Sequence, residues 1–362
     1  MTSGGTESDA GADVVTETAL WPDVLGRLVR REELPDDLAE RALSTILEGD
    51  ATDAQIAGFA VALRAKGESP RELAALVRTM LRFADRVDVE DPGTLVDTCG
   101  TGGDRSGSVN VSTMAALIAA GAGARVAKHG NRAASSRCGS ADVLEALGVV
   151  IDLGPEGVSR CVREAGIGFC FAPRFHPAMR FAGPPRRELG VATTFNFLGP
   201  LANPAGVRRQ AVGVSDPAMA ERMIGTLAAL GAERALVFFG HDGLDELTTT
   251  TTSTVYELRD GSIRSSELDP GSFGIPLAAP GALAGGDSAG NAAVVHRVLS
   301  GQAGPVRDIA VLNAAAALVA AGLVDDIADG IDSAGASIDD GRAAAVLEGF
   351  VRTSVAAREE GA

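Results

Sequence analysis

The chain has 362 residues, of which 46% are hydrophobic and 4% aromatic, and its formal net charge is −16. The length suits a large domain with a smaller one beside it. The acidic charge argues against nucleic acid as a partner, because proteins that bind phosphate backbones usually present a basic face. The low aromatic content also argues against stacking of single-stranded bases.

Cysteine spacing and hydropathy predict a cytoplasmic protein. No CxxC pair and no metal-finger spacing occurs among Cys99, Cys138, Cys161 and Cys170. We therefore expect reduced, buried thiols. The first residues lack the basic start and apolar block of a signal peptide. The longest apolar run, 309–324, is shorter than a membrane span and contains Asn313, so we expect no membrane partner.

The N-terminal part is predicted to be helical after a disordered tail. Residues 1–18 are rich in Gly, Ser, Thr and Asp, as in disordered segments. From Trp21 to about Val87 the pattern is helical, and we assign residues 19–88 to a small helical domain. Three helices are opened by Pro35-Asp36-Asp37, by Asp50-Ala51-Thr52-Asp53 and by Ser69-Pro70-Arg71-Glu72.

Strands and helices alternate after Asp91-Pro92-Gly93. A buried strand over 94–98 is followed by a helix over 112–122, and a strand over 125–127 by a helix over 141–147, before the apolar Val149-Val150-Ile151. This βαβα order predicts an α/β fold with a central, mostly parallel sheet. Further strands are expected over 210–214, 235–239, 253–259 and 262–265, and Asp260-Gly261 is a hairpin turn between the last two.

The alternation is interrupted by a segment rich in proline and arginine over 172–187, which we interpret as a crossover or lid. Ala-rich helices close the chain. The large α/β domain is therefore assigned to residues 91–171 and 196–362.

Two polar loops follow neighbouring strands, Gly100-Thr101-Gly102-Gly103-Asp104 and Lys128–Ser136. Open α/β sheets bind ligands at such carboxyl ends. The first loop offers bare backbone N–H groups, and a helix begins directly after it at 110–113, so its free N–H groups can face an anion. It matches neither the Walker loop nor the dinucleotide fingerprint. In the second loop, Lys128 suits phosphate as a point charge and Arg132 as a bidentate fork.

Three further features each have two interpretations. The adjacent acids Asp245 and Glu246 after an apolar strand are either solvated surface groups or ligands for a hard cation, with the Ser112 hydroxyl completing the site. His129 is either a general base or a hydrogen-bonded packing residue. The pair Arg186-Arg187 is either solvated or supplies one arginine to a substrate carboxylate.

Seven motifs between about Asp97 and Ser253 resemble the anthranilate phosphoribosyltransferase family: GTGGD, N-x-ST, KHGNRAASS, SADVLEALG, APRFHPAM, FNFLGPLANP and GLDELTTTTTS. The resemblance implies a small helical domain, joined by about 172–195, and a large α/β domain with a cleft between them. It implies a homodimer formed through the helical domain. The implied reaction joins anthranilate to phosphoribosyl pyrophosphate (PRPP) and releases pyrophosphate in tryptophan biosynthesis, with two Mg2+ per subunit.

The resemblance also implies site residues. Ser112, Asp245 and Glu246 match the magnesium positions, and Gly100, Asn131 and Arg186 match the anthranilate site. The positions that match the PRPP site are Gly100, Gly103, Asp104, Ser108, Asn110, Val111, Ser112, Thr113, Lys128, His129, Gly130, Asn131, Arg132, Ala133, Ala134, Ser135, Ser136 and Ser140.

The chain departs from the family pattern at two places. Arg105 stands where a glycine usually follows GTGGD, and Ser108-Val109 replaces a usual Thr-Phe pair. We assign no catalytic acid or base, because positioning and electrostatics suffice for attack by a neutral aromatic amine. Two alternatives remain: an enzyme similar to the pyrimidine nucleoside phosphorylases, which share the architecture, and a non-catalytic homologue that binds nucleic acid.

Overall fold

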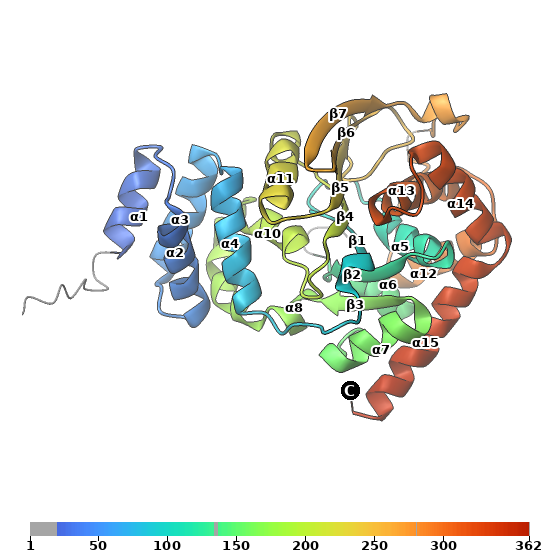
Figure 1. Cartoon of the computed structure of the whole chain (residues 1–362), viewed down its shortest axis with the longest axis horizontal. Coiled ribbons are helices and arrows are strands. Elements are labelled where there is room, and N and C mark those ends of the chain that lie inside the picture. The colour runs from blue at the N-terminus through green and yellow to red at the C-terminus, as the bar shows by residue number, and fades with distance from the viewer. Residues whose placement is uncertain (1–19, 134–136, 280, 362) are drawn as a thin grey trace, which may run out of the picture.

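The computed structural model describes residues 20–133, 137–279 and 281–361 (Figure 1). The predicted disordered tail, 1–18, and positions 134–136 of the second loop, which include Ala134, Ser135 and Ser136, lie outside the described residues.

Four helices form the N-terminal unit, at the left of Figure 1. They are α1 (Leu20–Val29), α2 (Asp36–Glu48), α3 (Asp53–Lys66) and α4 (Pro70–Arg82). The three predicted helix starts are confirmed, and α1 is an additional helix before them. Thr52 and Ser69 each accept a bond from the backbone N–H three residues on, within a capping box, which explains why these starts are readable locally.

A seven-stranded sheet has the order β3-β2-β1-β4-β5-β6-β7. The first five strands in this order pair in parallel, and β6 and β7 are antiparallel. The predicted α/β class with a mostly parallel sheet is therefore confirmed. The strands are β1 (Leu95–Gly100), β2 (Arg125–Gly130), β3 (Ile167–Phe171), β4 (Arg209–Gly213), β5 (Arg234–Gly240), β6 (Ser253–Arg259) and β7 (Ser262–Leu268).

The sheet differs from the prediction in several places: the sequence does not predict β3, and β1 and β7 continue to Gly100 and Leu268. Strand β2 continues through Lys128, His129 and Gly130, which the sequence places in a loop, because both polar side chains find buried partners. The apolar stretch 149–151 is buried but forms no strand; α7 (Pro155–Ala165) follows it, and the next strand is β3.

Helices cover both faces of the sheet. A separate hydrophobic cluster lies on each face. One lies among α5 (Val111–Gly121), α13 (Pro305–Ala321) and the C-terminal helices, and the other joins α11 (Pro217–Ala229) to the N-terminal helical unit. Figure 1 shows this arrangement, with the sheet between α5 and α11. The remaining long helices are α12 (Ser288–Leu299), α13 (Pro305–Ala321), α14 (Ile327–Asp339) and α15 (Arg342–Glu359). The four cysteine side chains are buried, as predicted.

The segment interpreted as a crossover or lid consists of short helices. These are α8 (Ala172–Phe175), the 3-10 helix η3 (Pro177–Ala182) and α9 (Gly183–Leu189), and α10 (Phe195–Leu201) follows them. Helix η3 contacts α2, and α9 contacts α3, so the segment lies against the N-terminal unit. Within the part of the chain that the structure describes, every helix is too short or too polar to cross a bilayer.

Candidate active site

The sheet reverses its direction of growth between β1 and β4. From β1 the chain adds β2 and then β3 on one side, and it returns to place β4 on the other side of β1. Open α/β sheets bind ligands at such a switch point, outside the carboxyl ends of the strands. Gly100 and Gly213 end the two strands as paired neighbours, and Thr101 N donates to Gly213 O at 2.9 Å.

The acids Asp245 and Glu246 lie over these strand ends. Their side chains point inward, with residue exposures of 9% and 8%, so they are not the solvated surface pair of the simpler interpretation. Asp245 Oδ2 accepts a hydrogen bond from Gly102 N at 2.7 Å, and Glu246 Oε1 accepts one from Ser112 N at 3.1 Å. The acids are thus bound to the glycine-rich loop and to the first turn of α5.

Two glycines make room for Asp245. A Cβ at Gly100 would lie 3.0 Å from Asp245 Cγ and inside van der Waals contact of Oδ2. A Cβ at Gly213 would lie 2.5 Å from the Asp245 carbonyl carbon. Gly213 was not among the predicted site residues, although a glycine within a predicted strand often marks a close approach of backbones.

Burial raises the pKa values of both acids, and little positive charge lies near them to offset this. Desolvation, together with the neighbouring Asp104 carboxylate, raises the pKa of Asp245 to about 7. Desolvation and then the Asp245 charge raise the pKa of Glu246 well above its usual range, and Lys128 offsets this only in part. A divalent cation bound between them would relieve both effects, so the residues fit Mg2+, which one or two carboxylates plus substrate phosphates commonly hold.

No group of three or more His, Cys, Asp or Glu side chains suited to a metal ion occurs among residues 20–133, 137–279 and 281–361.

Lys128 and His129 face opposite sides of the sheet, because successive residues of a strand alternate. Lys128 Nζ donates to Thr98 O at 2.6 Å and to Ser112 Oγ at 3.2 Å, toward α5 and the acids. His129 Nδ1 instead lies 2.9 Å from Gly199 O, in α10. Of these two neighbours, only Lys128 directs its side chain toward the acid pair.

His129 is a buried, neutral imidazole. Its ring centroid is 5.1 Å from that of His176. Desolvation, and next the charge of His176, lower the pKa of His129 to about 3. A group of this pKa is a weak base at neutral pH, so the environment favours the packing interpretation over a general base.

The first loop has the backbone of an anion cradle. Gly102 and Gly103 have φ of +68° and +82°, and Arg105 has φ +58°, a conformation that residues with a Cβ rarely adopt. Arg105 therefore occupies a position that favours glycine, which accounts for its being unusual there.

Asn110 precedes the first residue of α5 and is fixed by bonds to Cys138 O and Asn291 Nδ2. The other predicted positions in this loop and first turn are Ser108, Val111 and Thr113, of which Val111 and Thr113 are buried.

Arg132, in the second loop, is paired with two carboxylates other than Asp245 and Glu246. Arg132 pairs with Asp142 and Glu145, both at 2.8 Å, and its guanidinium lies 5.8 Å from the Phe171 ring centroid. Asn131 is exposed, and its carbonyl accepts from Ser140 Oγ at 3.2 Å. Ala133 N donates to Asp142 Oδ2 at 3.1 Å. To reach a phosphate, Arg132 would have to leave its two carboxylates.

Arg186 is a half-buried arginine without a carboxylate partner among the described residues. Its guanidinium lies 5.8 Å from the ring centroid of Phe195, and burial lowers its pKa. Its neighbour Arg187 is exposed. A desolvated guanidinium of this kind favours a carboxylate ligand, because an anion restores the interactions lost from water.

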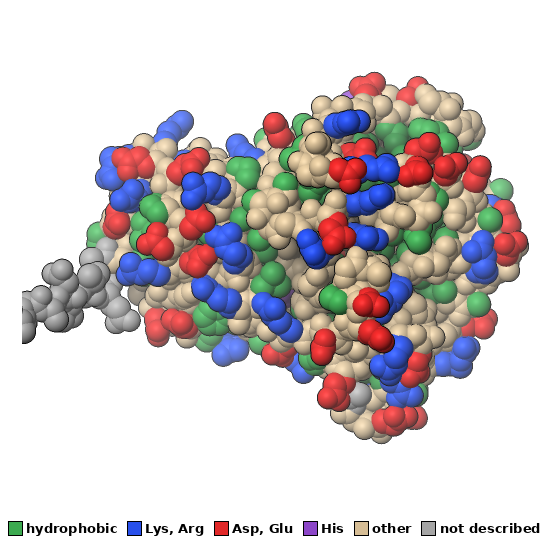
Figure 2. All heavy atoms as spheres, viewed as in Figure 1, with side chains coloured by type: hydrophobic (Ala, Val, Ile, Leu, Met, Phe, Trp, Pro, Cys, Tyr) green, Lys and Arg blue, Asp and Glu red, His purple; other side chains and the backbone are tan. Residues whose placement is uncertain are grey.

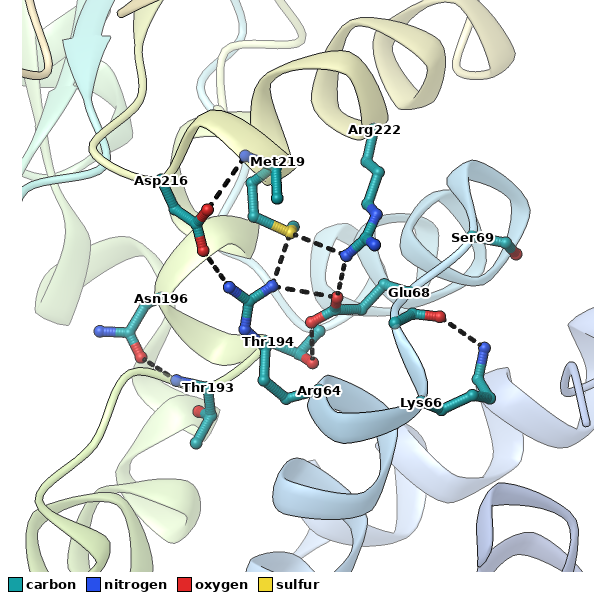
Figure 3. Close-up of polar contacts among 12 residues, drawn as sticks. Arg64, Lys66, Glu68, Ser69, Thr193, Thr194, Asn196, Asp216, Met219 and Arg222 are labelled. Atoms are coloured by element: carbon teal, nitrogen blue, oxygen red, sulfur yellow. Dashed lines mark hydrogen bonds and ion pairs between the residues drawn. The ribbon is translucent and has the colours of Figure 1, made fainter. Parts of the chain in front are cut away.

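The segment that carries Phe195 is anchored by a partly buried ionic cluster, which we name the Glu68 cluster and define as Arg64, Glu68, Thr194, Asp216 and Arg222 (Figure 3). Glu68 accepts from Thr194 Oγ1 at 2.7 Å, from Arg222 at 3.1 Å and from Arg64 at 3.3 Å, and Arg64 also pairs with Asp216. The cluster ties the helical unit to α10 and α11. No spacing in the sequence indicates it, because its members come from four separate elements.

Comparisons with known proteins place this chain in a family. Models of the glycosyl transferase family match the chain twice, the helical bundle domain at residues 22–84 and the a/b domain at residues 92–344. The anthranilate phosphoribosyltransferase of Nocardioides sp. is 55% identical over 336 residues, covering 91% of this chain and 98% of that protein. The chain belongs to the anthranilate phosphoribosyltransferase family. It is therefore an enzyme of the glycosyl transferase type, and the resemblance predicted from the motifs is confirmed.

Solved structures of the family share the fold. The enzyme from Thermus thermophilus superposes with a TM-score of 0.87 at 42% identity, covering 92% of this chain and 99% of that one. The Saccharomyces cerevisiae enzyme in complex with PRPP and Mg has a TM-score of 0.86 at 27% identity, covering 94% of this chain and 99% of that one. A further structure of the yeast enzyme contains 4-fluoroanthranilate, at TM-score 0.84 and 26% identity over 94% of this chain and 99% of that one.

Proposed function

We propose that this protein transfers the phosphoribosyl group of PRPP to the amine of anthranilate, giving N-(5-phosphoribosyl)anthranilate and pyrophosphate in tryptophan biosynthesis. The main structural support for this function is the inward-facing pair Asp245 and Glu246. The pair is bound to the glycine-rich loop and to the first turn of α5, at the switch point of the sheet. The family's complexes with PRPP, Mg and an anthranilate analogue support it.

Asp245 and Glu246, with the Ser112 hydroxyl, would hold magnesium, and we propose two ions per subunit. Bound magnesium neutralises the charge that builds on the departing pyrophosphate. Lys128 lies beside Ser112 and adds a fixed positive charge to the same region. These residues thus stabilise the leaving group without a proton transfer.

The phosphates of PRPP are assigned to backbone N–H groups and to the second loop. The positive-φ backbone at Gly102 and Gly103 turns the chain at the end of β1, and the first turn of α5 follows. Gly102 N and Ser112 N are bonded to Asp245 and Glu246, so they would have to exchange these carboxylates for phosphate oxygens. Residues 128–136 and Ser140 supply the remaining contacts in this proposal. Arg132 joins them after exchanging its carboxylates for phosphate oxygens.

Arg186, Asn131 and Gly100 are assigned to anthranilate. The planar fork of Arg186 suits the two oxygens of a carboxylate. The aromatic amine is already neutral at pH 7, so its attack on the anomeric carbon needs little help from a base. The site therefore acts by positioning the amine and by electrostatic stabilisation of the leaving group.

A direct assay tests this function. Purified protein is incubated with anthranilate, PRPP and Mg2+, and phosphoribosyl anthranilate is detected by mass spectrometry. We expect the product only when both substrates and the metal are present. Consumption of thymidine or uridine with inorganic phosphate would favour the nucleoside phosphorylase alternative, and a shifted nucleic acid band in a gel would favour the binding homologue.

We further propose a cytoplasmic homodimer formed through the helical domain, 19–88 with about 172–195. Exposed valines on helices of this domain support an apolar contact surface, with Val29 76% and Val61 43% exposed. Figure 2 shows acidic and basic side chains intermixed on the visible face rather than gathered in a basic band, which supports small-molecule partners rather than nucleic acid. Light scattering of the purified protein measures the assembly; a monomer mass would remove the dimer proposal.

A further inference from the structure

One polar side chain interrupts an apolar helix core. In α13 every residue from Ile309 to Ala321 is buried, and Asn313, with an exposure of 1%, is the polar residue within that stretch. A buried amide is costly unless its donors and acceptor are all bonded, so its partners indicate its role.

The Asn313 amide binds the backbone of the residue that follows the acid pair. Its Oδ1 accepts from Leu247 N at 2.9 Å, and its Nδ2 donates to Leu247 O at 2.9 Å and to Ile309 O at 2.9 Å. Both backbone polar groups of Leu247, which is fully buried, are therefore held by one side chain from an element 66 residues away.

The acid pair is fixed on both sides. Upstream, Gly240 N donates to Leu244 O at 2.9 Å, which closes the turn before Asp245. Downstream, the Asn313 amide fixes Leu247 directly after Glu246. Two carboxylates held close together away from water repel each other, and only a segment tied at both ends keeps both of them facing the same crevice.

We propose that Asn313 is a positioning residue that holds Asp245 and Glu246 in the geometry needed for the divalent cation. The inference rests on the proposed function, because that function supplies the cation. Groups that orient metal ligands without touching the metal typically change its affinity about 10- to 100-fold when removed.

The test uses Mn2+ as the probe, with electron paramagnetic resonance counting the free ion in the presence of PRPP. The variants are Asn313→Ala, Asn313→Gln and the control Ser354→Ala. Alanine suits the helix, and Gln keeps an amide one methylene further out. Ser354 is equally buried and accepts a loop bond, from Val150 N at 3.1 Å, in a loop that carries none of the assigned metal ligands.

We expect Asn313→Ala to bind Mn2+ about 10- to 100-fold more weakly, Asn313→Gln to be intermediate, and Ser354→Ala to match the wild type. Hydrogen exchange of segment 244–249 in the metal-free protein should also be faster only in the Asn313 variants. If Asn313→Ala does not fold, the Asn313→Gln variant carries the comparison.

Two results overturn the proposal. Wild-type affinity for Mn2+ in a folded Asn313 variant would contradict it while leaving the proposed function intact. A wild type that binds no Mn2+ with PRPP would remove the proposed metal role itself, and the inference with it.

Discussion

A single methyl group at Gly100 should displace Asp245, the first of the proposed magnesium ligands. The added Cβ would lie 3.0 Å from Asp245 Cγ, too close for the carboxylate to keep its place, so the side chain must rotate. Rotation breaks the 2.7 Å bond from Gly102 N to Asp245 Oδ2. A hydrogen bond to a charged group contributes about 1.5–3 kcal/mol, and about 1.4 kcal/mol corresponds to a factor of ten. We therefore expect Gly100→Ala to bind PRPP with Mg2+ about 10- to 100-fold more weakly.

Calorimetric titration of PRPP in the presence of Mg2+ measures this change. The matched control is Gly335→Ala in α14, where a Cβ would meet no atom within 4 Å. The control should bind PRPP like the wild type and gain up to about 1 kcal/mol of helix stability. If Gly100→Ala keeps wild-type affinity, the close approach of Asp245 to the end of β1 does not support the site.

The remaining predictions concern the acids, the anthranilate arginine, the Glu68 cluster and the buried imidazole. Asp245→Asn should lower turnover sharply and raise the Mg2+ concentration needed for half-maximal rate, because one negative ligand is lost. Arg186→Ala should raise the KM for anthranilate about 10- to 100-fold with little change in the KM for PRPP, and Arg186→Lys should recover little of this loss, since the planar fork is absent. Glu68→Ala should lower the free energy of unfolding by about 2 kcal/mol, measured with urea, because a buried carboxylate is removed, Arg222 loses its ion-pair partner and Arg64 keeps only Asp216. The folded pKa of His129 is about 3, below its ordinary 6.5, so the unfolded chain takes up this proton first as the pH falls. The stability that the neutral His129 imidazole contributes is complete above pH 6.5 and is lost as the pH falls from 6.5 to 3. His129→Asn should flatten that part of the plot of unfolding free energy against pH.

Each prediction has a contradicting result. An unchanged Mg2+ requirement in Asp245→Asn would count against the metal role, and equal losses for both substrates in Arg186→Ala would remove the anthranilate assignment. Wild-type unfolding of Glu68→Ala would make the Glu68 cluster energetically unimportant. An unaltered acid limb in His129→Asn would place the pH dependence in another group, such as His176, whose pKa burial lowers to about 4.

Local signals in the sequence predict much of the fold. The capped starts of α3 and α4 are readable because the capping residue and its partner lie three positions apart. The glycine-rich loop after β1 and the hairpin at Asp260-Gly261 are readable for similar reasons, since each needs a particular backbone shape. Adjacent acids after a strand marked the carboxylate pair, although only the fold shows that they face inward.

Contacts between residues far apart in the chain could not be predicted from the sequence. Lys128 and His129 look like loop residues because two polar side chains are unexpected in a buried strand, and their partners in α5 and α10 are not visible locally. The fit of Gly213 under Asp245 and the Glu68 cluster likewise join elements far apart in the chain. Periodicity carries no information on such contacts.

The position of the metal is the most direct test of the proposed roles of Asp245 and Glu246. Crystals grown with PRPP and Mn2+ in place of Mg2+ would reveal the ion by its anomalous scattering. We predict density bounded by the carboxylates of Asp245 and Glu246, with pyrophosphate oxygens on its other side and the Gly100 loop around them. Density elsewhere, with those two acids turned away from the diphosphate, would contradict these roles.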